Sequence, residues 1–508
     1  MLSRVRSAVL VGIDAFPLQI EVDIHNGLPA FTVVGLPDTA IKESRERIRS
    51  ALRNSGFTFP DGVITANLAP ADLKKEGTQL DLALAVAILN ASGQVPHVPD
   101  HALLAGELSL SGEVRAIHGT LSISLMASRE GVKELFVPGD NAPEAAVCDD
   151  VAVRPVRHLK DLTGHMGGVD RIPAQPSEAL SPSERTMYSV DLSDVRGQWQ
   201  AKRALEIAAA GGHNLLMVGP PGTGKSILAQ RLPTLFPPME LEESLETTRI
   251  HSAAGLLPPD TSLLWARPFR SPHHTVSYAG LTGGGTVPRP GEITLAHNGV
   301  LFLDELTEFR RDTLEALRQP MENGSVTITR SNRSLTFPAR FMLVAAMNPC
   351  PCGHLGHPKQ PCKCTPTQVT RYRSKISGPL LDRIDLAVDV PALTYDEFTA
   401  DSHSPRSDEV RKRVSDARKR QFQRLKIPGR TNACMGPREI ETFCPKEPEI
   451  DRILKSAMDR FGLSGRSIHR TLKVARTIAD LEDKDILEPS HVAEALQFRI
   501  QVTEAAKY

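Results

Sequence analysis

The sequence has no long hydrophobic run and no excess of charge of either sign. Among its 508 residues the longest apolar run spans 82–89, well short of the about 18 residues that a membrane-spanning helix needs. A shorter apolar run near the N-terminus ends at Asp14 without a small-residue cleavage pattern, which favours a strand over a signal peptide. Lys plus Arg and Asp plus Glu both number 60, which excludes a uniformly polybasic protein but permits a local basic stripe. We therefore expect no membrane partner.

Aromatic residues and dispersed cysteines are also scarce. Only 5% of the residues are Phe, Trp or Tyr, which disfavours recognition of nucleic-acid bases by stacking. Of the seven cysteines, four fall within the fifteen residues 350–364. Such clustering argues against a disulfide framework and favours a cytoplasmic protein with a local metal site.

Composition divides the chain into blocks, and its length allows roughly three domains. Residues 1–168 mix strand-like alternation with helical runs, which predicts an α+β domain. Residues 169–187 are rich in Pro, Ser and polar residues and are typical of a linker. Residues 188–395 alternate strands and helices, which predicts an α/β core with a parallel sheet, and residues 396–508 are mostly helical.

A glycine-rich loop lies between an apolar strand at 215–218 and an apolar helix, and it reads GPPGTGKS at 219–226. In this pattern the backbone N–H groups wrap a phosphate chain, the lysine pairs with the β- and γ-phosphates, and the serine hydroxyl binds Mg²⁺. The loop predicts a site for ATP and Mg²⁺ that is made by Gly219, Pro220, Pro221, Gly222, Thr223, Gly224, Lys225 and Ser226.

Three later motifs offer the remaining groups of a nucleotide-hydrolysing site. The apolar strand GVLFLDEL ends in Asp304, which is predicted to reach Mg²⁺, and Glu305, which is predicted to polarise the attacking water. FMLVAAMNP places Asn348 where its amide would orient that water. GPLLDRIDL places Arg383 on a turn, from which it would reach the nucleotide of a neighbouring subunit. The alternatives are a helix cap for the two carboxylates and an ordinary salt bridge for the arginine.

These motifs, together with LSGRSIHRTLKVARTIADL, resemble an AAA+ ATPase of the magnesium-chelatase-like branch, and more closely the YifB/ComM family of bacterial competence-associated helicases. The resemblance covers nearly the whole chain. It implies a helical lid at 396–508 that carries Arg466 as a nucleotide sensor. It also implies a homohexamer that moves on single-stranded or branched DNA, independently of sequence. Such a helicase or branch-migration factor would serve recombination of incoming DNA in natural transformation.

The first block resembles the proteolytic (S5 domain 2-like) domain of Lon, on the evidence of KKEGTQLDLALAVAIL and AGELSLSGEVRAIHGTLSISL. The Lon serine position, two residues after Gly77, holds Gln79, and the stretch at 119–125 that corresponds to the Lon lysine holds no lysine. A Ser–Lys dyad needs both groups, so peptidase activity is not expected. The resemblance leaves two roles open, namely DNA binding with ring assembly, and a purely structural scaffold.

The cysteine cluster reads C-x-C, nine residues, C-x-C. Four thiolates on a short loop suit tetrahedral Zn²⁺ in a structural site, which predicts Cys350, Cys352, Cys362 and Cys364 as ligands. His354 or His357 would substitute for one of them. Free thiols and a redox switch are the alternatives.

Two segments resemble the channel hairpins of the chelatase and MCM-helicase branch. PFRSPHHTVSYAGLTGGGTVPRPGE offers Arg270 and Arg289, and VTITRSNRSLTFPARF carries Arg330 and Arg333 at its tip. We expect these arginines to grip the DNA backbone, although each alone is more often a solvated surface charge. Residues 405–430 hold ten Lys or Arg and three Asp or Glu, which indicates either a further phosphate-contacting surface or a solvated helix.

Two rival functions use the same residues. A chelatase-type remodeller that inserts metal into a tetrapyrrole would share the ATPase core but would not need the Lon-like domain. A non-motor regulator that uses ATP as a switch would not need the complete set of Asp304, Glu305, Asn348 and Arg383.

Overall fold

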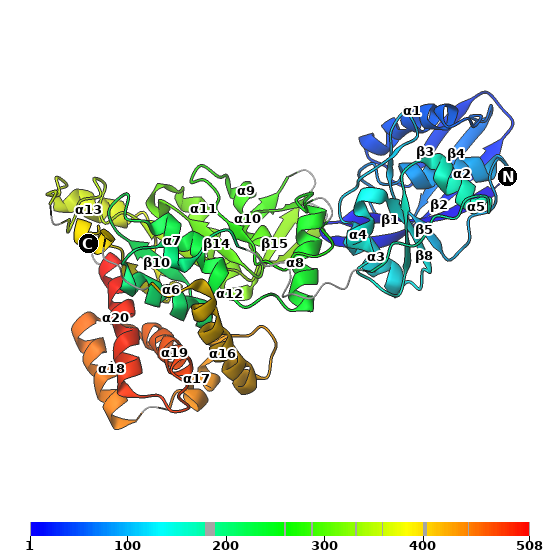
Figure 1. Cartoon of the computed structure of the whole chain (residues 1–508). Coiled ribbons are helices and arrows are strands. Elements are labelled where there is room, and N and C mark those ends of the chain that lie inside the picture. The colour runs from blue at the N-terminus through cyan, green and yellow to red at the C-terminus, as the bar shows by residue number, and fades with distance from the viewer. Residues whose placement is uncertain are drawn as a thin grey trace. The chain divides into compact units, whose positions relative to one another are not determined.

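The computed structural model describes residues 2–177, 188–258, 261–285, 288–330, 333–357, 359–399, 404–445 and 447–506. The chain divides into two compact units, Met1–Ser181 with Leu241–Leu264, and Pro182–Glu240 with Trp265–Tyr508 (Figure 1). The predicted α/β block and the predicted helical block thus belong to one unit. The segment Leu241–Leu264, which the sequence places inside the α/β block, belongs to the first unit.

The first unit is built on a seven-stranded mixed sheet in the order β3-β4-β2-β1-β5-β8-β9. The first two strands form an antiparallel pair, and β5, β8 and β9 run parallel to β1. The strands are β1 (Leu2–Val11), β2 (Asp14–His25), β3 (Ala30–Val34), β4 (Val63–Ala69), β5 (Ala102–Leu104), β8 (Glu134–Pro138) and β9 (Ala152–Val156), with a small ladder of β6 (Glu107–Leu108) and β7 (Val114–Arg115).

Helix α2 (Asp81–Ala91) lies in the core of this unit, and every residue from Leu82 to Leu89 is buried. A helix that is apolar on all faces has no side to present to water, which explains this position. Helix α1 (Thr39–Asn54) is amphipathic and is capped by Asp38, whose carboxylate accepts a hydrogen bond from the backbone N–H of Ile41. The other α-helices of residues 2–177 are α3 (Thr120–Arg129), α4 (Ala142–Ala145) and α5 (Leu159–Met166).

Helix α8 (Leu241–Ala253) packs on α3 as part of the first unit, although it follows the glycine-rich loop in the chain. The backbone N–H of Gly119 donates to the carbonyl of Ser252 over 3.2 Å. Arg249 forms an ion pair with Asp14, with 2.5 Å between Nη2 and Oδ1. The side chain of Ser252 bonds the buried carboxyl of Glu144. These contacts make α8 an integral part of the first unit.

The second unit contains a five-stranded sheet in the order β11-β14-β17-β10-β18, and all neighbouring strands are parallel. Its central strands are buried apolar runs, as expected for a parallel sheet covered on both faces. The parallel sheet of the α/β prediction is confirmed. The strands are β10 (Leu215–Val218), β11 (Phe269–Arg270), β14 (Val300–Leu303), β17 (Met342–Met347) and β18 (Leu386–Asp389).

Short helices and two hairpins complete the sheet-bearing part of this unit. The hairpins pair β12 (Gly283–Gly284) with β13 (Arg289–Pro290), and β15 (Ser325–Arg330) with β16 (Arg333–Pro338). The helices are α6 (Trp199–Gly211), α7 (Lys225–Arg231), α9 (Tyr278–Thr282), α10 (Glu292–Leu295), α11 (Arg311–Glu315), α12 (Arg318–Asn323), α13 (Pro366–Arg373), α14 (Gly378–Leu381) and α15 (Tyr395–Thr399).

The chain ends in a helical region that shares one apolar core with β10, β18 and α6. Its helices are α16 (Ser407–Leu425), α17 (Pro437–Phe443), α18 (Pro448–Phe461), α19 (Gly465–Leu481) and α20 (Pro489–Ala506), which group together in Figure 1. The predicted all-helical C-terminal block is therefore present. Within the described residues, no helix combines the length and the apolar character that crossing a membrane requires.

Candidate nucleotide site

The glycine-rich loop leaves the end of β10, which lies between β17 and β18 in the sheet. Ligands of open parallel sheets bind at the carboxyl ends of the strands, at the point where the order of the strands in the sheet reverses. Gly219 admits no side chain, because a Cβ atom there would lie 2.2 Å from the carbonyl oxygen of Val390. Gly222 and Gly224 have φ angles of +77° and +89°, which glycine adopts without strain. The backbone conformation of the loop therefore favours glycine at these three positions.

Lys225, at the start of α7, is enclosed by the loop and is only 7% exposed. Its Nζ donates to the carbonyls of Gly219 and Pro220 over 2.7 and 2.8 Å. Burial lowers the pKa of this ammonium, and the charges of Asp304 and Glu305 oppose that shift. The loop thus holds one desolvated positive charge, which suits a polyanionic phosphate chain.

The carboxyl ends of β14 and β17 bring Asp304 and Asn348 close to Lys225 and Ser226. The Ser226 hydroxyl donates to Oδ2 of Asp304, just beyond β14, over 2.6 Å. The Lys225 Nζ lies 3.3 Å from Oδ1 of Asn348, just beyond β17. A hydroxyl and a carboxylate oxygen side by side are ligands that Mg²⁺ accepts. The structure therefore joins Ser226, Asp304, Lys225 and Asn348 in one site.

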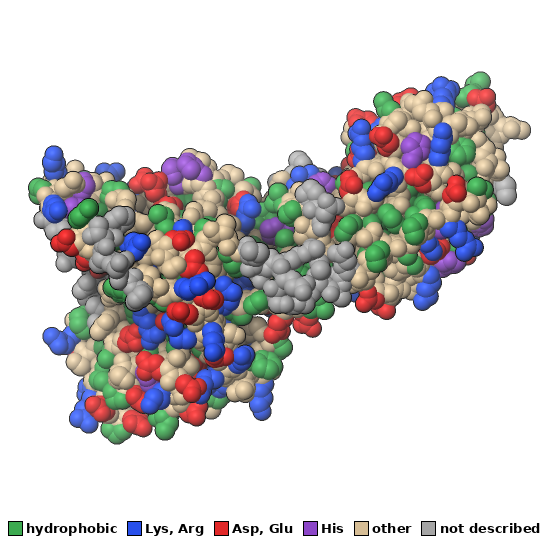
Figure 2. Space-filling view, in the orientation of Figure 1, with side chains coloured by type: hydrophobic (Ala, Val, Ile, Leu, Met, Phe, Trp, Pro, Cys, Tyr) green, Lys and Arg blue, Asp and Glu red, His purple; other side chains and the backbone are tan. Residues whose placement is uncertain are grey.

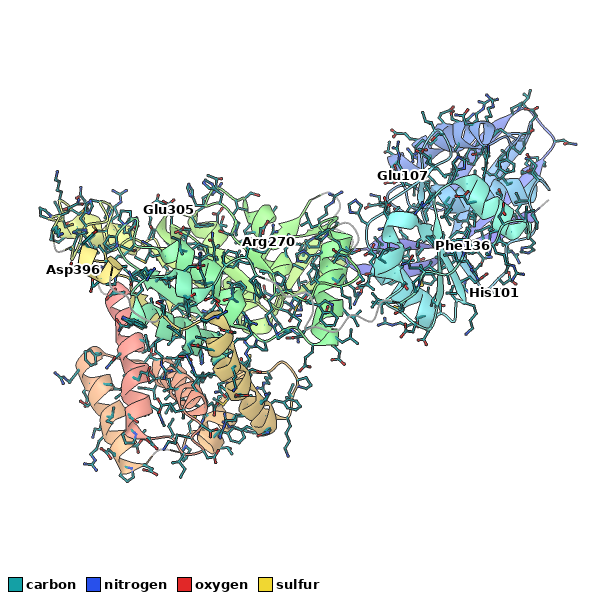
Figure 3. All side chains as sticks on the ribbon, in the orientation of Figure 1. His101, Glu107, Phe136, Arg270, Glu305 and Asp396 are labelled. Carbon is teal, nitrogen blue, oxygen red and sulfur yellow. The ribbon has the colours of Figure 1, made fainter. Side chains whose placement is uncertain are left out.

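Glu305 stands at the rim of this site and points outward, with its side chain 57% exposed. Its φ of +51° is a left-handed conformation, which is uncommon for residues other than glycine. The carboxylate meets His274, with 3.4 Å between Oε2 and Nδ1. Figure 3 labels Glu305 in this unit. Sequence reasoning missed His274, although its place four residues after β11, the strand beside β14, was an available signal.

Arg383 and Arg466 are placed differently from the groups above. The Arg383 guanidinium is bound by the carboxylate of Glu322 and the carbonyl of Pro379. Arg466 is exposed in the first turn of α19. Within the described residues, no hydrogen bond or ion pair joins either arginine to the glycine-rich loop of its own chain. Their roles as trans finger and lid sensor stay predictions.

A buried ionic cluster ties α19 to β18 beside the site. The Asp385 carboxylate is buried and accepts from Arg470 Nη1 over 2.5 Å and from the backbone N–H of Asn214 over 3.0 Å. Burial alone would raise the pKa of Asp385, but Arg470 and His213 hold it well below its usual range. The Asn214 amide also donates to the carbonyl of Arg383 over 3.0 Å. Helix α19, the entry to β10 and the Arg383 turn are therefore connected through hydrogen bonds and an ion pair.

The four predicted metal-ligand cysteines come together on the loop that follows β17. Their sulfur atoms all lie within 4.8 Å of one another, and Cys350 is fully buried. His354 and His357 do not belong to this group. The Nδ1 atom of His357 instead accepts the backbone N–H groups of Lys359 and Gln360. The arrangement fits a Cys₄ site, and the histidine alternatives are not supported by the geometry.

The predicted DNA-contacting arginines lie on or near the two hairpins. Arg270, labelled in Figure 3, is held in a bidentate ion pair with Glu292, with distances of 2.7 and 2.8 Å, so its guanidinium is already engaged. Arg289 is exposed in β13. The backbones of Arg330 and Arg333 pair at the closed end of β15–β16, as the sequence predicted for a hairpin. Their side chains lie outside the described residues.

Among the described contacts, four of the ten Lys or Arg residues at 405–430 form ion pairs with carboxylates of other elements, among them three on α16. Arg413 pairs with Glu206 and Arg420 with Asp485, while Arg424 binds Asp480 over 3.0 Å. Figure 2 accordingly shows Lys or Arg and Asp or Glu side by side over the helical region, on the face displayed. The local charge excess in the sequence therefore does not produce a continuous basic surface on α16.

This combination of a parallel sheet, a glycine-rich loop, the Ser226–Asp304 pair and a C-terminal helical region defines an AAA+-type nucleotide-binding protein. The profile described as "Magnesium chelatase, subunit ChlI" matches residues 191–398. Those described as "Subunit ChlI of Mg-chelatase" and "Magnesium chelatase, subunit ChlI C-terminal" match residues 20–141 and 404–499.

Two full-length relatives narrow the class further. The chain is 44% identical to the protein YifB of Escherichia coli K12, over 98% of this chain and 97% of that protein. It is 43% identical to "Competence protein ComM" of Haemophilus influenzae Rd, over 99% of this chain and 98% of that protein. The chain belongs to the YifB/ComM family of magnesium-chelatase-like AAA+ proteins, and this membership implies ATPase activity.

Proposed function

We propose that this protein is an ATP-driven DNA motor that works as a ring of six subunits. In this role it unwinds DNA or promotes branch migration during recombination of incoming DNA in natural transformation. The name of the Haemophilus relative supports a competence role. The observation that carries the proposal is the junction of Lys225, Ser226, Asp304 and Asn348 in one site, with Glu305 at its rim.

The residues present fit ATP with Mg²⁺. The Lys225 ammonium would pair with phosphate oxygens, and Ser226 and Asp304 would hold the ion, which neutralises charge on the transferring phosphoryl group. Glu305 would turn inward to orient the attacking water, with Asn348 beside it. Arg383 of a neighbouring subunit and Arg466 of the lid would stabilise the transferring charge. The first unit would be a Lon-like domain in which the Gln79 amide, at the Lon serine position, donates to the carbonyl of Glu76.

Steady-state ATP hydrolysis with and without DNA tests this proposal. We expect DNA of unrelated sequences to stimulate turnover equally. Glu305→Gln should keep ATP affinity but lose turnover by about two to three orders of magnitude, because the group that orients water is gone while the Mg²⁺ ligands remain. Wild-type turnover in that variant would contradict the role of Glu305. Turnover that ignores DNA would contradict the motor.

The second candidate is a chelatase-type remodeller, because all three matching profiles describe a magnesium-chelatase subunit. The same assay separates the two. A remodeller would hydrolyse ATP without any response to DNA, and a non-motor switch would bind ATP with little turnover.

A further inference from the structure

The cysteine loop lies directly against the glycine-rich loop. It starts two residues after Asn348, and Gly353, within it, packs on Pro221 of the phosphate-binding loop. A Cβ atom at Gly353 would lie 2.6 Å from Cδ of Pro221, so the contact admits no side chain. On its other side the loop is anchored by Arg373 of α13, whose Nε donates to the carbonyl of Pro349 over 3.2 Å. The loop therefore bridges α13 and the nucleotide site.

The sulfur geometry matches a tetrahedral zinc site. Zn–S bonds of ~2.3 Å in a tetrahedron place the sulfur atoms about 3.8 Å apart. The Sγ atoms of Cys350, Cys352 and Cys362 lie 3.4, 3.6 and 3.6 Å from one another. Cys364 completes the set within the same 4.8 Å radius, and its backbone N–H points at the Cys362 sulfur over 3.4 Å. Such a backbone donor is common around thiolate ligands, since it offsets their negative charge.

We propose that these four cysteines bind one Zn²⁺ and that the loaded loop is a brace for the phosphate-binding loop, so that metal loading controls nucleotide affinity. On binding, the four thiols release four protons to solvent and become thiolates, so the site changes from neutral to a net charge of about −2. The four Zn–S bonds then fix the loop at 350–364, including Gly353. Gly353 in turn holds Pro221 beside Pro220, whose carbonyl accepts from Lys225.

The inference rests on the proposed ATP site, but zinc binding by the four cysteines is measured without nucleotide. Without metal the loop between the cysteine pairs has few other constraints, since most of its residues are exposed. Pro221 would then lose its support. A displaced phosphate-binding loop loses hydrogen bonds to phosphate, and each hydrogen bond to a charged group is worth at least about tenfold in affinity. We therefore expect nucleotide affinity to fall by at least about tenfold.

Two glycines of this loop provide a matched pair of variants. Gly353 and Gly356 have nearly the same left-handed φ, +80° and +78°, so alanine strains the backbone equally at both. Only Gly353 has a neighbour, because an added Cβ at Gly356 meets nothing within 4 Å. Neither glycine is a metal ligand. Gly353→Ala therefore tests the brace while the four sulfurs remain.

The experiment measures zinc per chain by atomic emission and affinity for a fluorescent ATP analogue, on full-length protein purified under reducing conditions. We expect about one zinc in the wild type, in Gly353→Ala and in Gly356→Ala, and none in Cys352→Ser/Cys364→Ser. Nucleotide affinity should fall at least tenfold in Gly353→Ala and in the double serine variant, and stay at the wild-type value in Gly356→Ala. Chelation of the wild type should lower affinity, and added Zn²⁺ should restore it, which covers the case of a variant that does not fold.

Each negative result overturns a different part of the proposal. Absence of zinc from reduced wild-type protein overturns the metal site. Equal nucleotide affinity in Gly353→Ala and Gly356→Ala, or in chelated and reloaded wild type, overturns the brace. A wild type that binds zinc but no nucleotide overturns the proposed ATPase. It also overturns the link between metal loading and nucleotide affinity, but not the metal site.

Discussion

Glu305 is the most exposed of the predicted catalytic groups that surround the phosphate-binding loop, and its described side-chain contact is with His274, an ion pair when the imidazole is protonated. The segment that carries His274 leads through α9 into the β12–β13 hairpin. A change in that hairpin therefore has a short path along the backbone to His274, and from there through the His274 contact to Glu305. The pair is half exposed, and exposed pairs contribute ~0.2–1 kcal/mol, so it biases the position of Glu305 without locking it.

We predict that His274→Ala raises ATP turnover in the absence of DNA by up to about fivefold, the factor that ~1 kcal/mol corresponds to, because Glu305 no longer has a partner outside the site. His273→Ala is the control, since the His273 ring lies tilted against that of His274, with 4.1 Å between the ring centroids, but has no described contact with Glu305. Steady-state hydrolysis measures both. A His274→Ala variant without turnover would show instead that the imidazole is required for hydrolysis.

Arg383 has a similar partner, because Glu322 binds its guanidinium within the chain. We predict that Arg383→Ala abolishes hydrolysis with nearly unchanged nucleotide affinity, since the arginine would serve the neighbouring site. Mixing it with Lys225→Ala subunits should restore part of the activity. Glu322→Ala should retain hydrolysis, because it frees the arginine. Loss of hydrolysis in Glu322→Ala, or no rescue in the mixture, would assign Arg383 to the local salt bridge that the sequence left as its alternative.

At the scale of the residue, the sequence predicted the groups that belong to contiguous motifs and missed those that depend on contacts across the sheet. Lys225, Ser226, Asp304 and Asn348 each follow an apolar strand, and parallel strands end at a common edge, so their convergence was predictable. His274 follows a strand of only two residues, which gives little periodic signal. The ion pair of Arg270 with Glu292 depends on a partner 22 residues away, which no spacing rule identifies.

At the scale of the element, the β15–β16 hairpin is the best-supported candidate for gripping DNA. The resemblance predicted a hairpin of two strands here, and the structure confirms a ladder of six residue pairs from Ser325↔Pro338 to Arg330↔Arg333. Helix α16, which looked equally basic in the sequence, has three of its seven basic side chains paired with Glu206, Asp480 and Asp485. Sequence counting treats charges as free because their partners lie far away in the chain.

We predict that Arg330→Ala/Arg333→Ala lowers affinity equally for unrelated DNA sequences and reduces the slope of log affinity against log salt by about one unit per lost phosphate contact. Hydrolysis without DNA should persist. Lys412→Ala/Lys426→Ala removes two charges from α16 and its C-terminal end, and we expect a smaller change in slope. A larger change in the lysine variant, with unwinding preserved in the arginine variant, would move the DNA contact from the hairpin to α16.

At the scale of the whole molecule, the chain crosses between its two units three times, after Ser181, after Glu240 and after Leu264. The segment between the last two crossings is α8 and its following loop, and it closes on itself through the Ser244 hydroxyl, which donates to the carbonyl of Leu264 over 2.7 Å. Sequence reasoning left α8 within the α/β block because contiguity is the default for a domain boundary. The helix is mostly polar, so its pattern did not show which apolar surface it would meet.

The attachment of α8 to the first unit can be tested with two glycines that both follow helices in left-handed conformation. Gly255, after α8, has φ of +71°, and a Cβ atom there would lie 2.0 Å from Cε1 of His118. Gly131, after α3, has φ of +67°, and a Cβ atom there meets nothing within 4 Å. Alanine costs each position about 1–2 kcal/mol of backbone strain, but only Gly255→Ala also pushes the end of α8 away from its neighbour. We predict that Gly255→Ala accelerates amide exchange in both 241–253 and 120–129, because the two helices protect each other, while 215–231 keeps its protection. Hydrogen exchange measured by mass spectrometry resolves these three peptides in the intact chain. If exchange in 241–253 instead rises together with 215–231, and 120–129 is unaffected, α8 belongs energetically to the nucleotide-binding unit despite its contacts with α3.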